Sequence, residues 1–311
     1  MNASDLGYNK DLFILPFDHR SSFEAGLLGI RGRQADPTEV EKLTAYKRVI
    51  YDGFLEALDQ DVPVETAAIL VDQKYGEELL TDANNRGITT CTSVEKSGQP
   101  EFDFEYGEDF GRRLKDASPT FAKALVRYNP DGDSQMNETQ RLRLKVLSDH
   151  AHSAGYKFMF ELLVSPTEGQ LESVGTDPSA YDLNLRPQLT VRAIQELQDA
   201  GVEPDVWKLE GMDDRDAAGS VVTQARAGGR DQVGIIVLGR AEDAQRVQDW
   251  LAIGAQTPGF IGFAVGRTVF WQPLVDFKDG SISRAEAVSR IAGTYRRMYR
   301  VFADARSTTT A

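Results

Sequence analysis

Short apolar runs alternate with longer amphipathic segments along nearly the whole chain. Eight runs have the length of strands, and they cover residues 12–18, 67–72, 87–95, 121–128, 156–164, 205–211, 233–239 and 260–266. The segments between them place apolar residues three or four positions apart, which is the periodicity of a helix with one buried face. The clearest of these segments are residues 40–58, 137–155, 186–201 and 241–255. Two of them end in Ala-Gly just before the next run, which suits a helix C-cap.

This alternation predicts one parallel α/β domain. Eight strands separated by helices favour a TIM (β/α)8 barrel over an open doubly wound sheet. The first run is not followed by Gly-x-Gly-x-x-Gly, the fingerprint of a Rossmann fold. The length also suits a barrel, so we predict a single domain over residues 1–311. Residues 165–186 lack a clear pattern, and we expect them on the active-site face, where a segment of this length can serve as a lid.

Composition and charge exclude several classes of protein. The formal net charge of -13 argues against nucleic acid or an anionic membrane as partner, because phosphate backbones are bound by clustered Lys and Arg. Cys91 is the single cysteine, so neither an internal disulfide nor a cysteine-rich zinc site is expected. No run resembles a membrane span or a secretory signal, so we expect a cytoplasmic protein. A homo-oligomer remains open, since no helix is apolar enough to identify an interface.

Polar residues gather where the predicted strands end. Every strand of a TIM barrel delivers its carboxyl end to one face, so these side chains should meet there and form the site. They are Asp18, His19 and Arg20 after the first run, Asp72 and Gln73 after the second, Arg127 in the fourth, Glu161 in the fifth, Lys208 and Glu210 in the sixth, Gly239 and Arg240 after the seventh, and Gly266 and Arg267 after the eighth. The set mixes acids and bases and is not a metal cage, so we expect no metal and no cofactor.

Three charged residues, Lys123, Glu161 and Lys208, share strand faces with apolar residues. Burying a charge is costly unless the charge is paired or used, and a structural ion pair would explain each residue alone. A lysine inside a barrel also suits Schiff-base chemistry, because burial and a neighbouring cation such as Lys123 can lower the pKa of Lys208. The resulting iminium takes up the electrons of a breaking C–C bond, and Glu161 can remove the hydroxyl proton that starts the cleavage.

Gly-Arg pairs follow the last two runs, at Gly239-Arg240 and Gly266-Arg267. The loops after strands seven and eight are the usual phosphate seat of a TIM barrel, where backbone N–H groups and a basic side chain bind the dianion. Either glycine alone would also fit the end of a strand or a turn. The repetition at these two places favours a phosphate site, so we predict a small sugar phosphate as the substrate.

The order of these motifs resembles the class I tagatose-1,6-bisphosphate aldolases and their sulfofructose-phosphate relatives. The similar segments are FDHRSS, ILVDQKYG, KALVRY, FELLVSP, WKLEG and VGRTVFW. The run LPFDHRSSF is similar to the hallmark of a narrower group, the DUF2090-type aldolase-like domain associated with the 5-dehydro-2-deoxygluconokinase of myo-inositol catabolism. His19 and the Leu238-Gly239-Arg240 turn depart from the tagatose enzymes, which have Gln and Ser-Ala-Gly there.

The resemblance implies a carbon–carbon lyase of carbohydrate metabolism that releases dihydroxyacetone phosphate and an aldehyde. By that resemblance, the roles are Lys208 as the Schiff-base lysine, Glu161 as general acid/base, Lys123 as supporting cation, Asp18 and Gln73 on substrate hydroxyls, and Arg267 on the phosphate. The inositol association suggests 2-deoxy-5-keto-gluconate 6-phosphate as the substrate and malonate semialdehyde as the aldehyde. Arg20 or Arg240 would then bind the carboxylate through the two parallel hydrogen bonds that a guanidinium offers.

Three alternatives remain open. The substrate is instead tagatose 1,6-bisphosphate or a sulfofructose phosphate; or Asp18, His19 and Glu161 are ligands of a metal-dependent aldolase or isomerase; or the barrel only binds a sugar phosphate. The other histidines, His150 and His152, fall in a helix-like segment before the fifth run, where we expect surface residues. A module that only binds its ligand needs no amine positioned to form an imine, which favours an enzyme.

Overall fold

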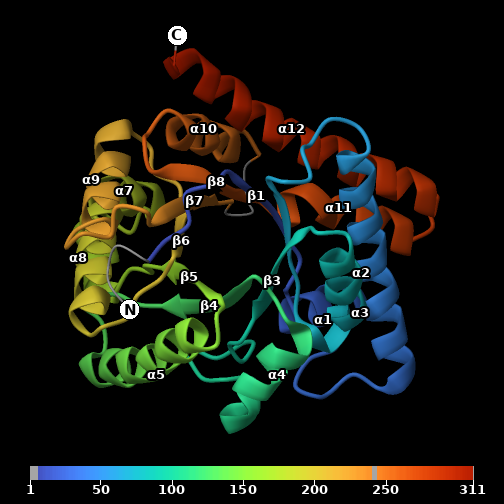
Figure 1. The fold of residues 1–311 in the computed structure, drawn as a ribbon, viewed down its shortest axis with the longest axis horizontal. Helices are drawn as coiled ribbons and strands as arrows, with labels where there is room; N and C mark the ends of the chain where they lie inside the picture. The colour runs from blue at the N-terminus through green and yellow to red at the C-terminus, as the bar shows by residue number, and fades with distance from the viewer. Residues whose placement is uncertain (1–5, 240–243, 311) are drawn as a thin grey trace.

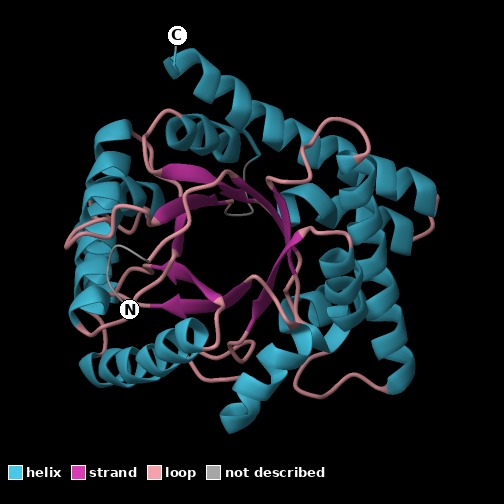
Figure 2. Cartoon of the chain, in the orientation of Figure 1, coloured by secondary structure: helices cyan, strands magenta, loops and turns pink. Residues whose placement is uncertain are grey.

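Eight parallel strands close into a barrel in the computed structural model, which describes residues 6–239 and 244–310 (Figures 1 and 2). The strands are β1 (Leu12–Pro16), β2 (Ala67–Leu70), β3 (Thr89–Ser93), β4 (Phe121–Arg127), β5 (Lys157–Leu163), β6 (Val206–Glu210), β7 (Gly234–Leu238) and β8 (Phe260–Ala264). Each strand pairs with the next along the chain, and β8 pairs with β1. The predicted TIM barrel is confirmed, and every strand lies inside the run predicted for it.

Helices surround the barrel on all sides (Figure 2). They are α1 (Ser21–Leu28), α2 (Pro37–Leu58), α3 (Gln73–Asn85), α4 (Phe110–Ala117), α5 (Ser134–Ser153), α6 (Glu168–Ser173), α7 (Pro178–Asn184), α8 (Arg186–Asp199), α9 (Arg215–Ala225), α10 (Ala244–Ala255), α11 (Arg267–Lys278) and α12 (Arg284–Thr310), with a 3-10 turn at Gly107–Asp109. The four clearest predicted helices correspond to α2, α5, α8 and α10. Both Ala-Gly endings are confirmed as helix ends, and Gly155 and Gly201 have the left-handed backbone that glycine favours there.

Period-two alternation divides the strands between two cores. On β1, Leu12 and Ile14 face the barrel interior, while Phe13 and Leu15 pack against the helices. The interior cluster is apolar near the amino ends of the strands; its members are Leu12, Ile14, Ala68, Leu70, Cys91, Phe121, Met159, Val206, Ile236, Ile261 and Ala264. Two residues further along β4, β5 and β6, the same alternation brings charged side chains into the barrel. The apolar cluster therefore forms a layer of the barrel interior below a charged layer.

Residues 165–186 are more ordered than their sequence pattern predicts. They contain the short helices α6 and α7, whose N-caps Thr167 and Asp177 accept hydrogen bonds from the backbone N–H groups of Gln170 and Ser179. Tyr181 is buried, and its hydroxyl donates to the carbonyl of Val164 at 2.8 Å. The sequence pattern did not indicate these helices, because local caps can build short helices without a long apolar stripe. A lid role for this segment stays a prediction.

The expectation that His150 and His152 lie on the surface was wrong. Both are partly buried at the end of α5. The His152 Nε2 atom lies 3.0 Å from Asp205 Oδ2, and the His150 ring packs edge-on against Phe110. Asp205 immediately precedes β6, so His152 belongs to the floor of the barrel, away from the carboxyl ends of the strands. None of the described helices is long and apolar enough to cross a membrane.

Candidate active site

The carboxyl ends of the strands surround a cavity of about 570 Å³. Eleven of the predicted site residues line it: Lys123 and ten of those selected from the strand ends, namely Asp18, His19, Arg20, Arg127, Glu161, Lys208, Glu210, Gly239, Gly266 and Arg267. These residues come from β1 and β4 to β8 or from the loops that follow those strands. Arg240 lies outside the described residues. The convergence expected from the barrel geometry therefore occurs for most of the predicted set.

Glu161 lies between two lysines in the cavity wall. Its Oε2 atom is 2.9 Å from Lys208 Nζ and 2.9 Å from Lys123 Nζ. Glu161 and Lys208 face each other in the β5–β6 ladder, which explains why their side chains meet. All three side chains are buried, with exposed fractions of 6% or less. The strand alternation therefore brings together the three charged residues that the sequence singled out.

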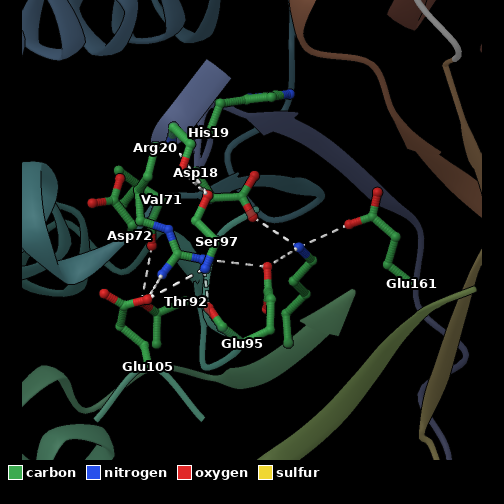
Figure 3. Close-up of polar contacts among 12 residues, drawn as sticks. Asp18, His19, Arg20, Val71, Asp72, Thr92, Glu95, Ser97, Glu105 and Glu161 are labelled. Atoms are coloured by element: carbon green, nitrogen blue, oxygen red, sulfur yellow. Dashed lines mark hydrogen bonds and ion pairs between the residues drawn. The ribbon is translucent and has the colours of Figure 1, made fainter. Parts of the chain in front are cut away.

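Lys123 has two further carboxylate partners. Its Nζ atom donates to Asp18 Oδ2 and to Glu95 Oε1, both at 2.8 Å. Figure 3 shows Asp18, Glu95 and Glu161 converging on this one ammonium group. Burial alone would lower the pKa of Lys123, but the three carboxylates outweigh burial and raise it well above its ordinary value. Lys123 is therefore held as a cation.

The same contacts keep two of these carboxyl groups ionised. Burial alone would raise the pKa of Glu161, but the ammonium groups of Lys123 and Lys208 outweigh it and lower that pKa. The pKa of Asp18 is likewise lowered, because the two lysines outweigh its burial. Glu161 is therefore a carboxylate at neutral pH, in contact with the nitrogen of Lys208 and able to accept a proton from it.

Glu95 is a residue of the cavity wall that the sequence analysis missed. It follows β3, lines the cavity and is 7% exposed. Arg20 holds the Glu95 backbone in place: it donates to the Glu95 carbonyl at 2.6 Å and to Glu105 Oε2 at 3.1 Å. The signal was present, because Glu95 is the last residue of the third predicted run. The strand-end rule that selected residues from the other seven runs would also have selected Glu95 from the third.

His19 presents an uncharged imidazole to the cavity. Burial lowers its pKa to about 4, with Asp18 opposing that shift and the Arg267 guanidinium adding to it. The ring lies edge-on to Phe270 of α11, and its Nδ1 atom has no hydrogen-bond partner within the described ranges. A neutral imidazole can donate from one nitrogen and accept at the other, so His19 is suited to bind a substrate hydroxyl.

The predicted phosphate seat lies beside the start of α11. Gly239 and Gly266 line the cavity, and α11 begins at Arg267 with Gly266 at its N-cap. A Cβ atom at Gly266 would lie 2.3 Å from the carbonyl oxygen of Pro16, so a side chain is excluded there. Arg267 is exposed at the rim of the cavity. A helix N-terminus, two close backbone segments and a guanidinium suit a phosphate dianion.

Asp72 and Gln73 do not line the cavity, which corrects the substrate-binding roles predicted for them. β2 ends at Leu70, and the chain then turns into α3, so Asp72 becomes the N-cap that accepts from the Tyr75 N–H at 3.0 Å. Its other carboxylate oxygen accepts from Lys47 of α2, forming an ion pair buried in the helix layer. Gln73 donates to the carbonyl of Arg113 at 3.2 Å. Both side chains therefore stabilise the scaffold.

Lys47 is the second residue that the sequence analysis missed. It is fully buried and donates to the carbonyls of Phe17 and His19, at 2.8 and 3.1 Å. These carbonyls flank Asp18, so Lys47 fixes the backbone that directs Asp18 toward Lys123. The signal was weak: Lys47 lies four residues after Leu43, on the buried stripe of α2.

The described residues contain no group of three or more His, Cys, Asp or Glu side chains arranged to hold a metal ion. The metal-dependent alternative uses Asp18, His19 and Glu161 as ligands. Asp18 and Glu161 instead bind the ammonium group of Lys123. Within the described ranges, the ligand set of that alternative is therefore not formed.

A protein-family model described as "Uncharacterized protein conserved in bacteria (DUF2090)" matches residues 4–306. The chain belongs to this family. Among curated proteins, the DUF2090 chain is 25% identical over 186 residues to tagatose 1,6-diphosphate aldolases of Listeria monocytogenes strains. The matched region is 58% of this chain and 53% of those relatives, so the chain spans about half the length of the curated relatives it matches.

Solved structures resemble the DUF2090 chain in fold. A structural-genomics target from Corynebacterium glutamicum gives a TM-score of 0.56 at 15% identity, covering 96% of this chain and 90% of that one. A fructose-bisphosphate aldolase from Slackia heliotrinireducens gives 0.53 at 15% identity, covering 94% and 88%. An archaeal fructose 1,6-bisphosphate aldolase gives 0.52 at 13% identity, covering 90% and 94%. At these identities the likeness shows a common fold.

Proposed function

We propose that this chain is a class I aldolase that forms a Schiff base on Lys208. It cleaves a phosphorylated ketose or keto acid into dihydroxyacetone phosphate and an aldehyde. The observation that carries the proposal is the difference between the two buried lysines. Lys123 contacts three carboxylates, whereas Lys208 contacts only Glu161 among the described residues. Lys123 is suited to remain a cation, and Lys208 is suited to be the nucleophile.

Glu161 supplies the proton transfers that imine formation needs. It takes a proton from the Lys208 ammonium group, and the free amine then attacks the substrate carbonyl. Glu161 returns the proton to the hydroxyl of the adduct, which leaves as water and yields an iminium ion. The C–C bond next to the iminium carbon then breaks, and its electron pair forms an enamine. Protonation of the enamine carbon and hydrolysis release dihydroxyacetone phosphate and regenerate Lys208.

The phosphate end of the substrate binds beside Lys208. Gly239 follows β7, which pairs with the Lys208 strand β6, and Gly266 follows β8, one strand further around the barrel. The N-terminus of α11 and the exposed Arg267 add positive potential at the same place. A phosphate bound there places the neighbouring carbonyl carbon of a ketose phosphate close to the amine.

Relatives support the reaction class and leave the aldehyde to be identified. The Listeria relatives are named tagatose 1,6-diphosphate aldolases, and two structural neighbours are named fructose-bisphosphate aldolases. We propose that the protein is cytoplasmic. We propose 2-deoxy-5-keto-gluconate 6-phosphate as its substrate and malonate semialdehyde as the second product. Arg20, predicted for the substrate carboxylate, instead donates to Glu95 and Glu105, and Arg240 lies outside the described residues. Arg127 also lines the cavity, and its guanidinium suits that carboxylate. Tagatose 1,6-bisphosphate and sulfofructose phosphate are the competing substrates.

The direct test is borohydride reduction with dihydroxyacetone phosphate, followed by intact-mass measurement and peptide mapping. We expect one reduced adduct on Lys208 in the unmodified protein, and no adduct in the Lys208→Arg variant. The Lys123→Arg variant is the matched control, because it keeps the second cation and should still form the adduct. An adduct on Lys123 would contradict the assignment of the nucleophile.

The same experiment separates an aldolase from a barrel that only binds. Dihydroxyacetone phosphate that binds in calorimetry without forming an adduct on any lysine would refute the Schiff-base mechanism. If the adduct forms, condensation of dihydroxyacetone phosphate with malonate semialdehyde tests the proposed aldehyde. Glyceraldehyde 3-phosphate, the aldehyde that a tagatose bisphosphate enzyme would use, is the comparison.

A further inference from the structure

Aldol cleavage moves protons at two separate places, at the imine and at the hydroxyl group that becomes the aldehyde. Glu161, to which the sequence analysis gave the hydroxyl proton, contacts the nitrogen of Lys208 at 2.9 Å, so a second carboxylate is needed for the hydroxyl. We propose that Glu95 takes up this hydroxyl proton, and that its Oε2 atom contacts the substrate. The role rests on the proposed function and adds a catalytic residue to the same cavity.

The first observation is an oxygen atom without a partner. The carboxylates that line the cavity are those of Asp18, Glu95, Glu101, Glu161 and Glu210. Of these, Glu95 alone has a buried oxygen, Oε2, for which the described residues offer no hydrogen-bond donor. A buried acceptor left unpaired destabilises a fold, so such an atom in a cavity wall points to a ligand.

The Glu95 carboxylate is also held rigidly. Its Oε1 atom accepts from Lys123 Nζ at 2.8 Å, and Arg20 Nη2 lies 3.6 Å from the same oxygen. Arg20 is itself 6% exposed and is anchored on Glu105. Figure 3 shows the Arg20 side chain between Glu95 and Glu105. Contacts through Oε1 leave Oε2 as the oxygen that is available to a substrate.

The second observation is the order of the groups around the barrel. Lys208, Glu161 and Lys123 come from β6, β5 and β4, and Glu95 comes from the loop after β3; successive groups contact each other at 2.8–2.9 Å. The predicted phosphate seat lies on the other side of Lys208, after β7 and β8. A ketose phosphate has the same order: phosphate, carbonyl carbon, the carbon protonated in the enamine, and then the carbon with the reacting hydroxyl. A substrate extended along this row brings that hydroxyl to Glu95.

The proton and electron transfers then balance with water as the only further reagent. The hydroxyl proton moves to Glu95 Oε2, and the O–H electron pair becomes the second bond of the aldehyde carbonyl. The breaking C–C pair forms the C=C bond of the enamine, and the C=N pair returns to the Lys208 nitrogen. Glu95 passes the hydroxyl proton to solvent. Glu161, which is a carboxylate once the first water has left, takes a proton from solvent and delivers it to the enamine carbon. In the direction of condensation, Glu95 returns its proton to the aldehyde oxygen.

The environments of the two carboxyl groups agree with separate roles. Burial raises the pKa of Glu95, although Lys123 and Arg20 oppose the shift. The pKa of Glu161 is lowered instead, by the two lysines in contact with it. Two carboxyl groups in one site whose pKa values are shifted in opposite directions commonly divide acid and base roles between them.

Two reactions of the same protein separate these proton transfers. Exchange of the carbon-bound hydrogen of dihydroxyacetone phosphate with D2O, followed by NMR, requires Lys208 and Glu161 but no aldehyde. Condensation with malonate semialdehyde or glyceraldehyde 3-phosphate also requires the proton at the aldehyde oxygen. In Glu95→Gln we expect condensation to fall by about 100-fold or more. We expect exchange and the borohydride adduct on Lys208 to persist, which also reports that the site is folded.

Two comparison variants make the result decisive. Glu161→Gln should lose exchange and condensation together. Glu105→Gln weakens the support of Arg20 without altering the cavity wall, and should condense much faster than Glu95→Gln. The assignment is overturned if Glu95→Gln loses exchange in proportion to condensation, if it condenses at the normal rate, or if Glu105→Gln is equally impaired. An unmodified protein that forms no adduct would instead overturn the Schiff-base proposal itself.

Discussion

Buried charges lie at both ends of this barrel, but the two groups are built differently. At the amino ends of the strands, Asp205 is fully buried and accepts hydrogen bonds from the backbone N–H groups of Gly7 and Phe158 and from the Lys157 ammonium, and it contacts the His152 ring. We call these five residues the floor cluster. Both oxygens of Asp205 have at least one donor, so its charge is fully compensated by the fold.

At the carboxyl ends, compensation is incomplete. The mouth cluster consists of Asp18, His19, Arg20, Glu95, Lys123, Glu161 and Lys208. Within the described ranges, His19 Nδ1, Arg20 Nε and Glu95 Oε2 have no hydrogen-bond partner. A saturated network such as the floor cluster stabilises a fold, whereas an unsaturated one keeps hydrogen-bonding capacity for a ligand at some cost in stability. The comparison therefore assigns stability to the floor and chemistry to the mouth.

The floor cluster should give the largest change in stability. Asp205→Ala removes the acceptor of four donors and should lower the free energy of unfolding by about 3–5 kcal/mol, as for other broken buried ion pairs. Urea denaturation measures the loss. Asp205→Asn keeps one acceptor oxygen and should lose less. The folded fraction of either variant should still form the borohydride adduct, and a loss below about 1 kcal/mol for Asp205→Ala would contradict the comparison.

A substitution at the rim of the cavity should affect substrate binding rather than folding. Arg267→Ala removes a cation from the predicted phosphate seat and should raise the KM for dihydroxyacetone phosphate by about 10- to 100-fold, since a hydrogen bond to a charged group contributes about 1.5–3 kcal/mol. Steady-state condensation kinetics measure the KM, with kcat expected to change little. Arg290→Ala on the outer face of α12 is the matched control. Equal KM values for the two variants would remove Arg267 from the phosphate seat.

Acid should destabilise the floor in a predictable direction. Burial would raise the pKa of Asp205, but its hydrogen bonds with His152, Lys157 and the backbone lower it overall. The group therefore stabilises the fold above the ordinary carboxyl pKa of about 3.9, and this contribution is lost as the pH falls through the lowered folded-state value. Melting temperatures between pH 6 and 3, roughly the range over which carboxylates titrate, should fall more steeply for the unmodified protein than for Asp205→Ala. Parallel curves would show that Asp205 does not contribute.

The smallest expected effect is on stability at Glu95 in the mouth cluster. Its pH dependence has the opposite sign to that of Asp205. The pKa of Glu95 is raised by burial, so its charged form is disfavoured in the folded protein. A raised carboxyl pKa contributes stability at low pH that is lost as the pH rises through the folded-state value. Glu95→Gln should therefore leave the free energy of unfolding at pH 7 unchanged or raise it by up to about 1 kcal/mol, with a matching rise in melting temperature. The difference from the unmodified protein should vanish near pH 4. A large loss at pH 7 would place Glu95 among the structural residues.

Much of the site was predictable because strand alternation is a local property. A period of two determines which face of a strand a side chain occupies, so Lys123, Glu161 and Lys208 were expected inside the barrel before any contact was known. The rule that strand ends meet on one face likewise brought Asp18 and Arg267 to the cavity. The same rule failed for Asp72, because β2 ends early and the residue caps α3 instead.

The sequence by itself thus determined the order of strands and helices, the charged layer inside the barrel and its position above an apolar layer. Only the tertiary structure decided which charges pair. Asp18 and Lys123 are 105 residues apart and meet because the barrel closes. Among the described residues, closure also gives Lys123 three carboxylate partners and Lys208 one, and leaves Glu95 Oε2 without a hydrogen-bond donor. Periodicity determines the direction of a side chain, but the partner that it meets depends on the geometry of the whole barrel.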